Sequence, residues 1–148
     1  MKLSTRSTYG LRALVELALA RGRGPLSAAQ IARRQGLSVA YLEQLLHRLK
    51  KQGVVTSVRG PKGGYLLARE PEHIRIGEVV RMLEGEPALQ SLKTKDGHRH
   101  AQRIAQAVFR CVHERLAASL DAATLHEVCE DVHALSGEPL DHRYVFHI

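Results

Sequence analysis

The sequence predicts a mainly α-helical protein with one small β-hairpin, which we expect to be the wing of a winged helix-turn-helix, followed by a long helix. Apolar residues recur at helical spacing through most of the 148 residues. The clearest β-branched run, at 54–58, is followed by a basic, glycine-rich turn at 60–64. Trp is absent and aromatic residues make up 4% of the chain, so aliphatic side chains must fill the core.

The first helix is expected to run from position 4 or 5 to about position 20. Its apolar stripe consists of Leu11, Leu14, Val15, Ala18 and Leu19. We place Arg12 and Glu16 outside that stripe. Arg6 lies in the first turn, where free backbone N–H groups and its guanidinium could hold a phosphate if the turn abuts a duplex. A solvent-exposed helix start is the alternative.

Residues 27–51 have the pattern of two helices joined by a tight turn. Ser27 and Gln30 have the spacing of a capping box, Gly36 is suited to end the first helix, and Ser38 is suited to cap the second. The second helix has an apolar stripe of Leu42, Leu45, Leu46 and Leu49 and an opposite face of Glu43, Gln44, His47, Lys50 and Lys51. Two helices joined by a short turn that contains Gly are typical of a helix-turn-helix.

The second helix of such a motif normally enters the DNA major groove with its N-terminal residues at the base edges. Base discrimination is therefore expected from Ser38, Tyr41, Glu43 and Gln44. Glu43 can accept a hydrogen bond from a cytosine amine, and Gln44 can pair with adenine. Salt-sensitive phosphate contacts are expected from Arg6, Arg33, Arg34, Lys50 and Lys51.

A strand at 54–58, the turn, and a returning strand at 65–68 predict a hairpin directly after the recognition helix. Arg59 and Lys62 lie at its tip, where their charges suit a narrow, electronegative minor groove. The glycine-rich turn lacks the GK[ST] ending of a phosphate-binding loop. The chain also lacks a Ser-His-Asp, paired-carboxylate or His-Glu-x-x-His arrangement, so we do not expect an enzyme.

Charge is segregated along the chain. Residues 1–84 contain 15 Lys and Arg against 6 Asp and Glu, a formal charge of +9, whereas residues 85–148 contain 7 against 9, a charge of −2. Positive charge on the half that contains a groove-reading motif favours a nucleic-acid partner. With no apolar run near the roughly 20 residues of a membrane span and no signal peptide, we expect a cytoplasmic protein with reduced thiols and no membrane partner.

The remaining chain reads as a helix at 76–83, a polar loop at 86–97, a long helix from about 98 to 120, and a final helix. The long helix has an apolar stripe of Ile104, Val108, Val112 and Leu116, widened by Ala101, Ala105, Phe109, Cys111 and Leu120. Because the apolar arc is so broad, we expect an intermolecular partner. The final helix, capped by Asp121 or Thr124 and ended by Gly137, has a stripe of Leu125, Val128, Cys129, Val132 and Leu135. The predicted organisation is a DNA-binding unit at 1–85, the loop, dimerisation and final helices at 98–136, and a tail at 137–148.

Four segments carry a further signal. They are YGLRALVELALA, YLEQLLHRLKKQGVVTSVRGPKGGYLLAR, IRIGEVVRMLEG and, near the end, DAATLHEV. In combination they resemble the IscR-type (Rrf) family of bacterial transcriptional regulators. The resemblance implies a winged-helix homodimer, joined by the long helix, that binds a pseudo-palindromic operator and usually represses. It also implies base or backbone contacts from Ser38, Tyr41, Glu43 and Gln44, and minor-groove contacts from Arg59, Pro61 and Lys62.

Many members of that family hold an iron–sulfur cluster through three Cys in the loop before the long helix. Here residues 92–106 read LKTKDGHRHAQRIAQ and contain no Cys, with Arg103 about where the third would stand. Because such clusters need thiolate donors, we predict neither a family-type cluster nor another cofactor or metal.

Four residues are candidates for sensing a signal. Cys111 and Cys129 are either small buried hydrophobes or redox-sensitive thiols. His98 and His100 either lie on a solvent face or contribute to a divalent-metal site. The alternatives to a simple DNA-binding repressor are therefore a thiol- or metal-sensing regulator, or a protein-interaction module of the same fold with weak DNA binding.

Overall fold

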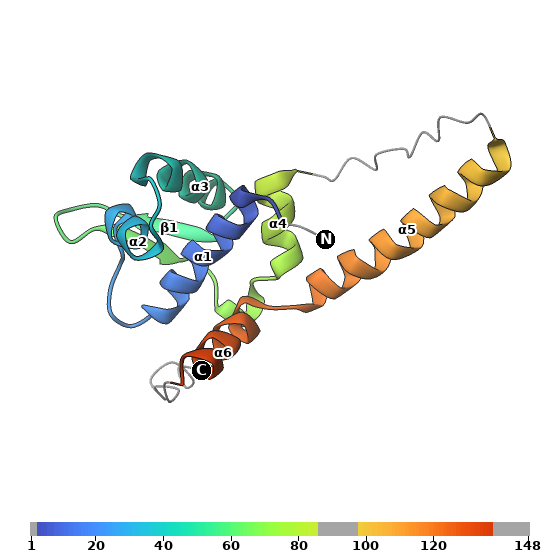
Figure 1. Ribbon diagram of the computed structural model, residues 1–148. Helices are drawn as coiled ribbons and strands as arrows, with labels where there is room; N and C mark the ends of the chain where they lie inside the picture. The colour runs from blue at the N-terminus through green and yellow to red at the C-terminus, as the bar shows by residue number, and fades with distance from the viewer. Residues whose placement is uncertain (1–2, 86–97, 138–148) are drawn as a thin grey trace.

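The computed structural model describes residues 3–85 and 98–137. The elements are, in chain order, α1 (Thr5–Leu19), α2 (Ala28–Gln35), α3 (Val39–Lys51), β1 (Val55–Val58), β2 (Gly64–Leu67), the 3-10 turn η1 (Pro71–His73), α4 (Ile76–Glu84), α5 (Arg99–Ala122) and α6 (Leu125–Ser136). Helices α1 to α4 and the hairpin form a head, from which α5 extends as a long arm (Figure 1). The predicted mainly helical fold with a small β-wing is confirmed.

The helix-turn-helix is built by the capping residues that the sequence indicated. The Ser27 hydroxyl accepts from the Gln30 backbone N–H at 3.1 Å, and the Gln30 side-chain oxygen accepts from the Ser27 N–H at 2.9 Å. Gly36 ends α2 in the left-handed conformation, with φ 65°. The Ser38 hydroxyl then accepts from the Tyr41 N–H at the start of α3. These caps satisfy helix-terminal backbone groups and fix the turn between α2 and α3.

The core lies between α1, α3 and α4 and is aliphatic, as the composition requires. All four predicted leucines of α3 are buried, at 0–2% exposure, together with Leu14 of α1, Ile31 of α2 and Val79 of α4. Helices α1 and α4 approach closely at Gly10. A side chain at this position would collide with the buried Leu83, so the approach requires glycine. The recognition helix is therefore held by a close-packed inner face, which leaves its outer face free.

The wing is an antiparallel hairpin in which Val55 pairs with Leu67 and Val58 with Gly64. Its second strand is also tied to the chain before α2, since the Leu26 N–H donates to the Tyr65 carbonyl at 3.1 Å and the Tyr65 N–H donates to the Leu26 carbonyl at 2.7 Å. Gly64 permits this approach: its φ is +156°, and a Cβ would collide with the Leu26 backbone. The wing is thus anchored to the helix-turn-helix.

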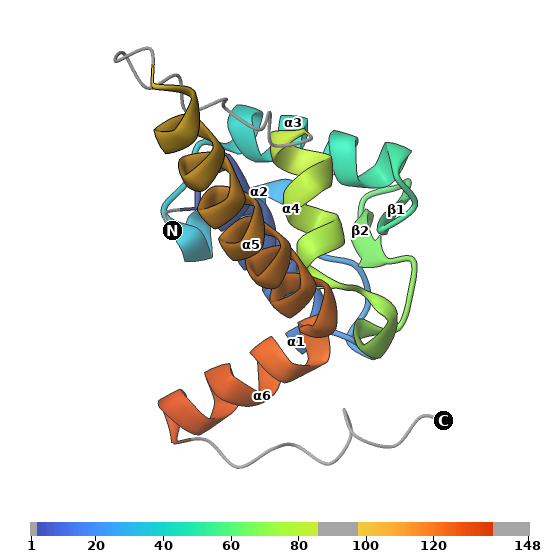
Figure 2. The ribbon, with the colours of Figure 1, turned by 90° about the vertical axis from the view of Figure 1, so that its right-hand side faces the viewer.

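The long helix is joined to the head at its C-terminal end (Figure 2). The Ile76 N–H donates to the Ala123 carbonyl and the Leu125 N–H to the Ile74 carbonyl, both at 2.9 Å. Asp121 forms an ion pair with Arg81 at 2.7 Å. We refer to these contacts, between residues 74–81 and 121–125, as the arm junction. They fix where the arm leaves the head.

The last helix is capped by Thr124, one of the two predicted caps, whose hydroxyl and Glu127 form a reciprocal capping box. Its inner residues Leu125 and Cys129 are buried, but the predicted apolar stripe does not extend to Leu135, which is 89% exposed. No neighbouring element of the described chain reaches the end of α6. The predicted loop at 86–97 and the tail from 138 lie outside the described residues. No described helix is long and apolar enough to cross a membrane.

Candidate nucleic-acid interface

The N-terminal part of α3 presents the predicted base-reading residues. Ser38, Glu43 and Gln44 are all exposed, whereas the ring of Tyr41 is half-buried. Tyr41 packs edge-on against Tyr9 of α1, with ring centroids 6.1 Å apart and planes at 82°. The polar residues are therefore accessible to a duplex, while most of the Tyr41 ring supports the helix from behind.

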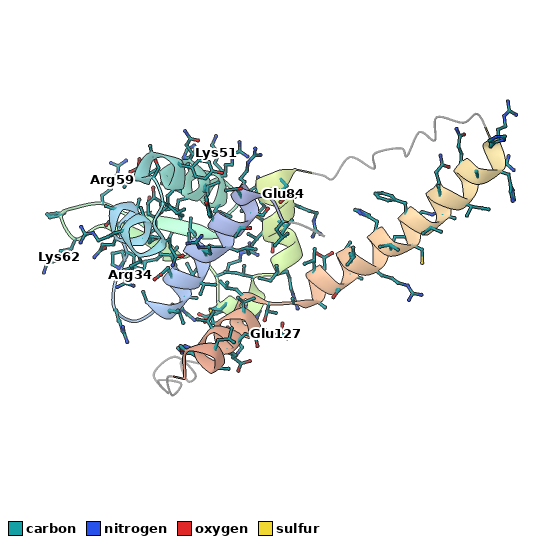
Figure 3. All side chains as sticks on the ribbon, in the orientation of Figure 1. Arg34, Lys51, Arg59, Lys62, Glu84 and Glu127 are labelled. Atoms are coloured by element: carbon teal, nitrogen blue, oxygen red, sulfur yellow. The ribbon has the colours of Figure 1, made fainter. Side chains whose placement is uncertain are left out.

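Positive charge gathers around this helix and the wing. Figure 3 shows Arg34, Lys51, Arg59 and Lys62 on the side of the molecule formed by α2, α3 and the hairpin, and Glu84 away from it on α4. Arg59, Lys62 and the neighbouring Pro61 are exposed at the wing tip. These four cations therefore share one side of the basic half of the chain, which suits a polyanionic partner.

Lys50 connects the recognition helix to the wing. Its ammonium donates to the Ser57 hydroxyl of β1 at 2.7 Å, and the residue remains exposed. Because an ammonium has three donors, one bond to Ser57 leaves others for a phosphate. A phosphate contact by Lys50 would therefore bear on both elements at once.

Arg6 makes an internal contact that the sequence did not predict. Its guanidinium donates to the carbonyl of Leu83 at 3.2 Å, and Arg48 of α3 donates to the same oxygen at 3.3 Å. This carbonyl lies in the last turn of α4, where backbone acceptors lack helical partners. Arg6 therefore ties α1 to α4, and its phosphate contact stays a prediction.

A carboxylate already lies at the start of α1. The pKa of Glu84 is lowered, first by the Ser7 hydroxyl, then by donors from Ser4 and by the charge of Arg6. The Ser4 N–H donates to the Glu84 carboxylate at 3.0 Å, whereas the buried Ser7 hydroxyl makes no hydrogen bond of good geometry. A phosphate approaching the first turn of α1 would meet the negative charge of this carboxylate. That charge disfavours the phosphate contact that we considered for Arg6 and the free N–H groups of this turn.

Sequence reasoning missed a polar cluster behind the helix-turn-helix. Arg12 and Glu16 were predicted only to lie outside the apolar stripe of α1, and the structure shows both half-buried against the end of α2. There Arg12 donates to Gln35, and Gln35 donates to Glu16 at 2.5 Å. Arg34 also pairs with Glu16, at 3.1 Å. Helical periodicity shows which residues of α1 lie outside its apolar stripe. It does not show which polar side chains of other helices those residues contact.

The sensor candidates differ in their environments. Cys129 is buried, and burial, with a smaller contribution from the Glu72 charge, raises the pKa of its thiol to about 11. Cys111 is exposed on α5, so within the single chain it does not fit the interpretation as a small buried hydrophobe. His98 and His100 are exposed at the start of α5. Among the described residues, no three His, Cys, Asp or Glu side chains are grouped to hold a metal.

Comparison with known proteins identifies the architecture. Residues 3–131 match the model of the Rrf2 family, described as an iron-dependent transcriptional regulator. The chain belongs to the Rrf2 family. It is 35% identical over 145 residues to the HTH-type transcriptional regulator IscR of Klebsiella pneumoniae, covering 97% of this chain and 89% of that protein. The resemblance noted in the sequence is therefore confirmed.

Solved structures of Rrf2 proteins have the same fold. T. potens IscR is 40% identical with a TM-score of 0.76, covering 97% of this chain and 96% of that one. CymR, the global cysteine regulator of B. subtilis, is 37% identical with a TM-score of 0.70, covering 88% of this chain and 97% of that one. The chain is accordingly a DNA-binding transcriptional regulator of the Rrf2 family, and its relatives are transcriptional regulators.

Proposed function

We propose that this Rrf2 protein is a cytoplasmic homodimeric repressor that reads a pseudo-palindromic operator and holds no family-type iron–sulfur cluster. The observation that carries the proposal is an exposed apolar stripe on α5 in a molecule whose head presents a cationic recognition face. A symmetric dimer presents two such faces related by a two-fold axis, which is the symmetry of a palindromic site. Occupation of promoter DNA by such a dimer would block transcription. We propose no enzymatic activity.

The stripe supports dimerisation through α5. Ile104, Val108, Val112 and Leu116 are spaced four residues apart and are 53, 58, 52 and 40% exposed. Isolated exposed apolar residues are common, but a continuous row along three turns of one helix is typical of an interface. The polar face of the same helix carries Arg103, Arg110 and Glu114, so the helix is amphipathic, and its apolar row is left exposed by the described part of the chain.

The donor set does not fit a family-type cluster. The 148-residue sequence contains two Cys, one exposed on α5 and one buried in α6, and neither lies within residues 86–97. Three thiolates from one chain are therefore not available, although iron–sulfur clusters are held mainly by thiolates. We derive no regulatory step through a cluster.

Duplex selection on the purified protein tests the proposal, together with a visible spectrum recorded after anaerobic purification. We expect enrichment of one inverted-repeat site and no charge-transfer band from a thiolate–iron centre. A visible band would overturn the absence of a cluster. Failure to enrich any duplex, or binding that is insensitive to salt, would favour a protein-interaction module instead.

Arg59→Ala provides a residue-level test of the interface. We expect operator affinity to fall by about 1–3 kcal/mol, because a guanidinium in a narrow minor groove gains from its concentrated negative potential. The matched control is Arg110→Ala, which removes the same charge from the polar face of α5. Binding isotherms at constant salt give the comparison. Equal affinities of Arg59→Ala and the wild type would remove Arg59 from the interface.

A further inference from the structure

The cluster of Arg12, Gln35 and Tyr9 lies behind the recognition helix and is not used by the DNA-binding role described above. We infer that Arg12 is a positioning residue for α3: it sets the register of the recognition helix on DNA without contacting DNA. The inference rests on the proposed operator binding and deepens it. It assigns to a residue of α1 a part in sequence specificity.

Arg12 holds the end of α2 with two hydrogen bonds. Its Nε donates to the Gln35 side-chain oxygen at 2.6 Å, and one terminal nitrogen donates to the Gln35 backbone carbonyl at 2.7 Å. Gln35 is the last residue of α2, directly before the left-handed Gly36. The bonded carbonyl is one of the acceptors that a helix end leaves without a partner, and cations are favoured there. Arg12 thereby fixes the point at which the chain turns toward α3.

The same guanidinium supports α3 through two aromatic rings. Its central carbon lies 5.2 Å from the centroid of the Tyr9 ring, within cation–π range. Tyr9 in turn meets Tyr41, in the first turns of α3, in an edge-on contact. Arg12 therefore touches the exposed helix-turn-helix both at the turn and, through Tyr9, at the base-reading end of α3.

The opposite side of the cluster is also fixed. Glu16, one turn further along α1, accepts from the Gln35 amide at 2.5 Å and pairs with Arg34. Gln35 is thus held by both Arg12 and Glu16 from a single helix. Arg12 is half-buried, and its planar, two-pronged donation is a geometry that a Lys ammonium cannot reproduce.

Substitution by Lys separates positioning from phosphate binding. A phosphate contact depends mainly on positive charge, so it would largely persist in Arg12→Lys. A positioning contact depends on the planar, two-pronged guanidinium, so it would be lost in Arg12→Lys. We expect Arg12→Lys to weaken operator binding by about 10- to 100-fold, comparable to one or more mismatched base pairs. Binding to a scrambled duplex, and the slope of log affinity against log salt, should be unchanged because no phosphate contact is lost.

The experiment compares wild type, Arg12→Lys, Gln35→Ala and the control Arg110→Lys, which lies on the exposed polar face of α5, each on the selected operator and on a scrambled duplex over a salt series. Circular dichroism melting establishes that each variant is folded at the assay temperature. Partial unfolding would weaken both duplexes equally, whereas loss of positioning weakens only the operator. Gln35→Ala, which keeps the Arg12 charge and removes its side-chain acceptor, should shift the operator-to-scrambled ratio in the same direction.

Two results would overturn the inference. The first is wild-type discrimination retained in both Arg12→Lys and Gln35→Ala. The second is equal weakening of both duplexes by Arg12→Lys, with a smaller salt slope. If the wild type itself does not distinguish any duplex, the proposed operator binding fails, and the role of Arg12 fails with it. If the wild type discriminates and both variants discriminate equally well, only the role of Arg12 fails.

Discussion

Introducing a carboxylate into the α5 stripe should convert the proposed dimer to monomers. Val108, in the middle of the row, is 58% exposed in the single chain. Fully burying a Val or Leu side chain is worth roughly 1.5–3 kcal/mol, so covering the exposed part of Val108 contributes about 1–1.5 kcal/mol. In a symmetric pair the contact occurs twice, which gives about 2–3 kcal/mol per dimer.

Val108→Asp loses this contribution and adds the cost of burying an unpaired charge. That cost is several kcal/mol per ion, or the equivalent rise in the carboxylate pKa. A combined loss of at least about 4 kcal/mol raises the dimer dissociation constant roughly 1,000-fold. The head should remain folded, because Val108 makes no contribution to its buried core.

Sedimentation velocity over a concentration series measures the effect. The matched control is Ala107→Asp, which places the same charge one residue away, at an exposed position off the stripe. We expect the control to sediment like the wild type and Val108→Asp to sediment as a monomer with weaker operator binding. A Val108→Asp protein that remains dimeric at wild-type concentrations would refute the assignment of this face. Equal dissociation of both variants would refute it as well.

Two further predictions concern ionisable groups. Because the folded pKa of Glu84 is lowered from 4.5, its stabilisation is present above that value and is lost as the pH falls through the folded pKa. Glu84→Gln should therefore lower the free energy of unfolding at pH 7 by about 0.3–1 kcal/mol and flatten its decline in acid, measured by urea unfolding; unchanged acid sensitivity would contradict this. At pH 8, the raised pKa of about 11 should make Cys129 at least about 100-fold slower toward iodoacetamide in the folded protein than in the denatured protein, as peptide mapping would show. Rapid labelling of Cys129 in Cys111→Ser would contradict its burial.

Local signals were sufficient to predict the head from the sequence. The capping box at Ser27, the left-handed Gly36 and the leucine stripe of α3 each act over a few residues, and all three appear in the structure. The hairpin was predicted for the same reason, although its first strand begins at Val55, after the turn that follows α3. Such features depend on backbone geometry and burial that a short segment itself specifies.

Contacts between distant segments were not predictable in the same way. The bonds of Arg12 to Gln35 and of Arg6 to Leu83 join residues 23 and 77 positions apart. Periodicity placed Leu135 on an apolar stripe, but no described element covers it and it remains exposed. Whether a polar or apolar residue finds a partner depends on how the helices cross, which is a property of the whole fold.

The arm junction has a consequence for operator architecture. The head is fastened to α5 by short backbone bonds at Ile76 and Leu125 and by the Arg81–Asp121 ion pair. In a dimer joined through α5, the separation of the two recognition helices would follow from the angle at which this fastening holds the arm. Base preference would then be encoded in α3 and half-site spacing in the junction, as two separately mutable properties. Exchanging α3 residues would change the preferred base sequence of each half-site while leaving the distance between the half-sites unaltered.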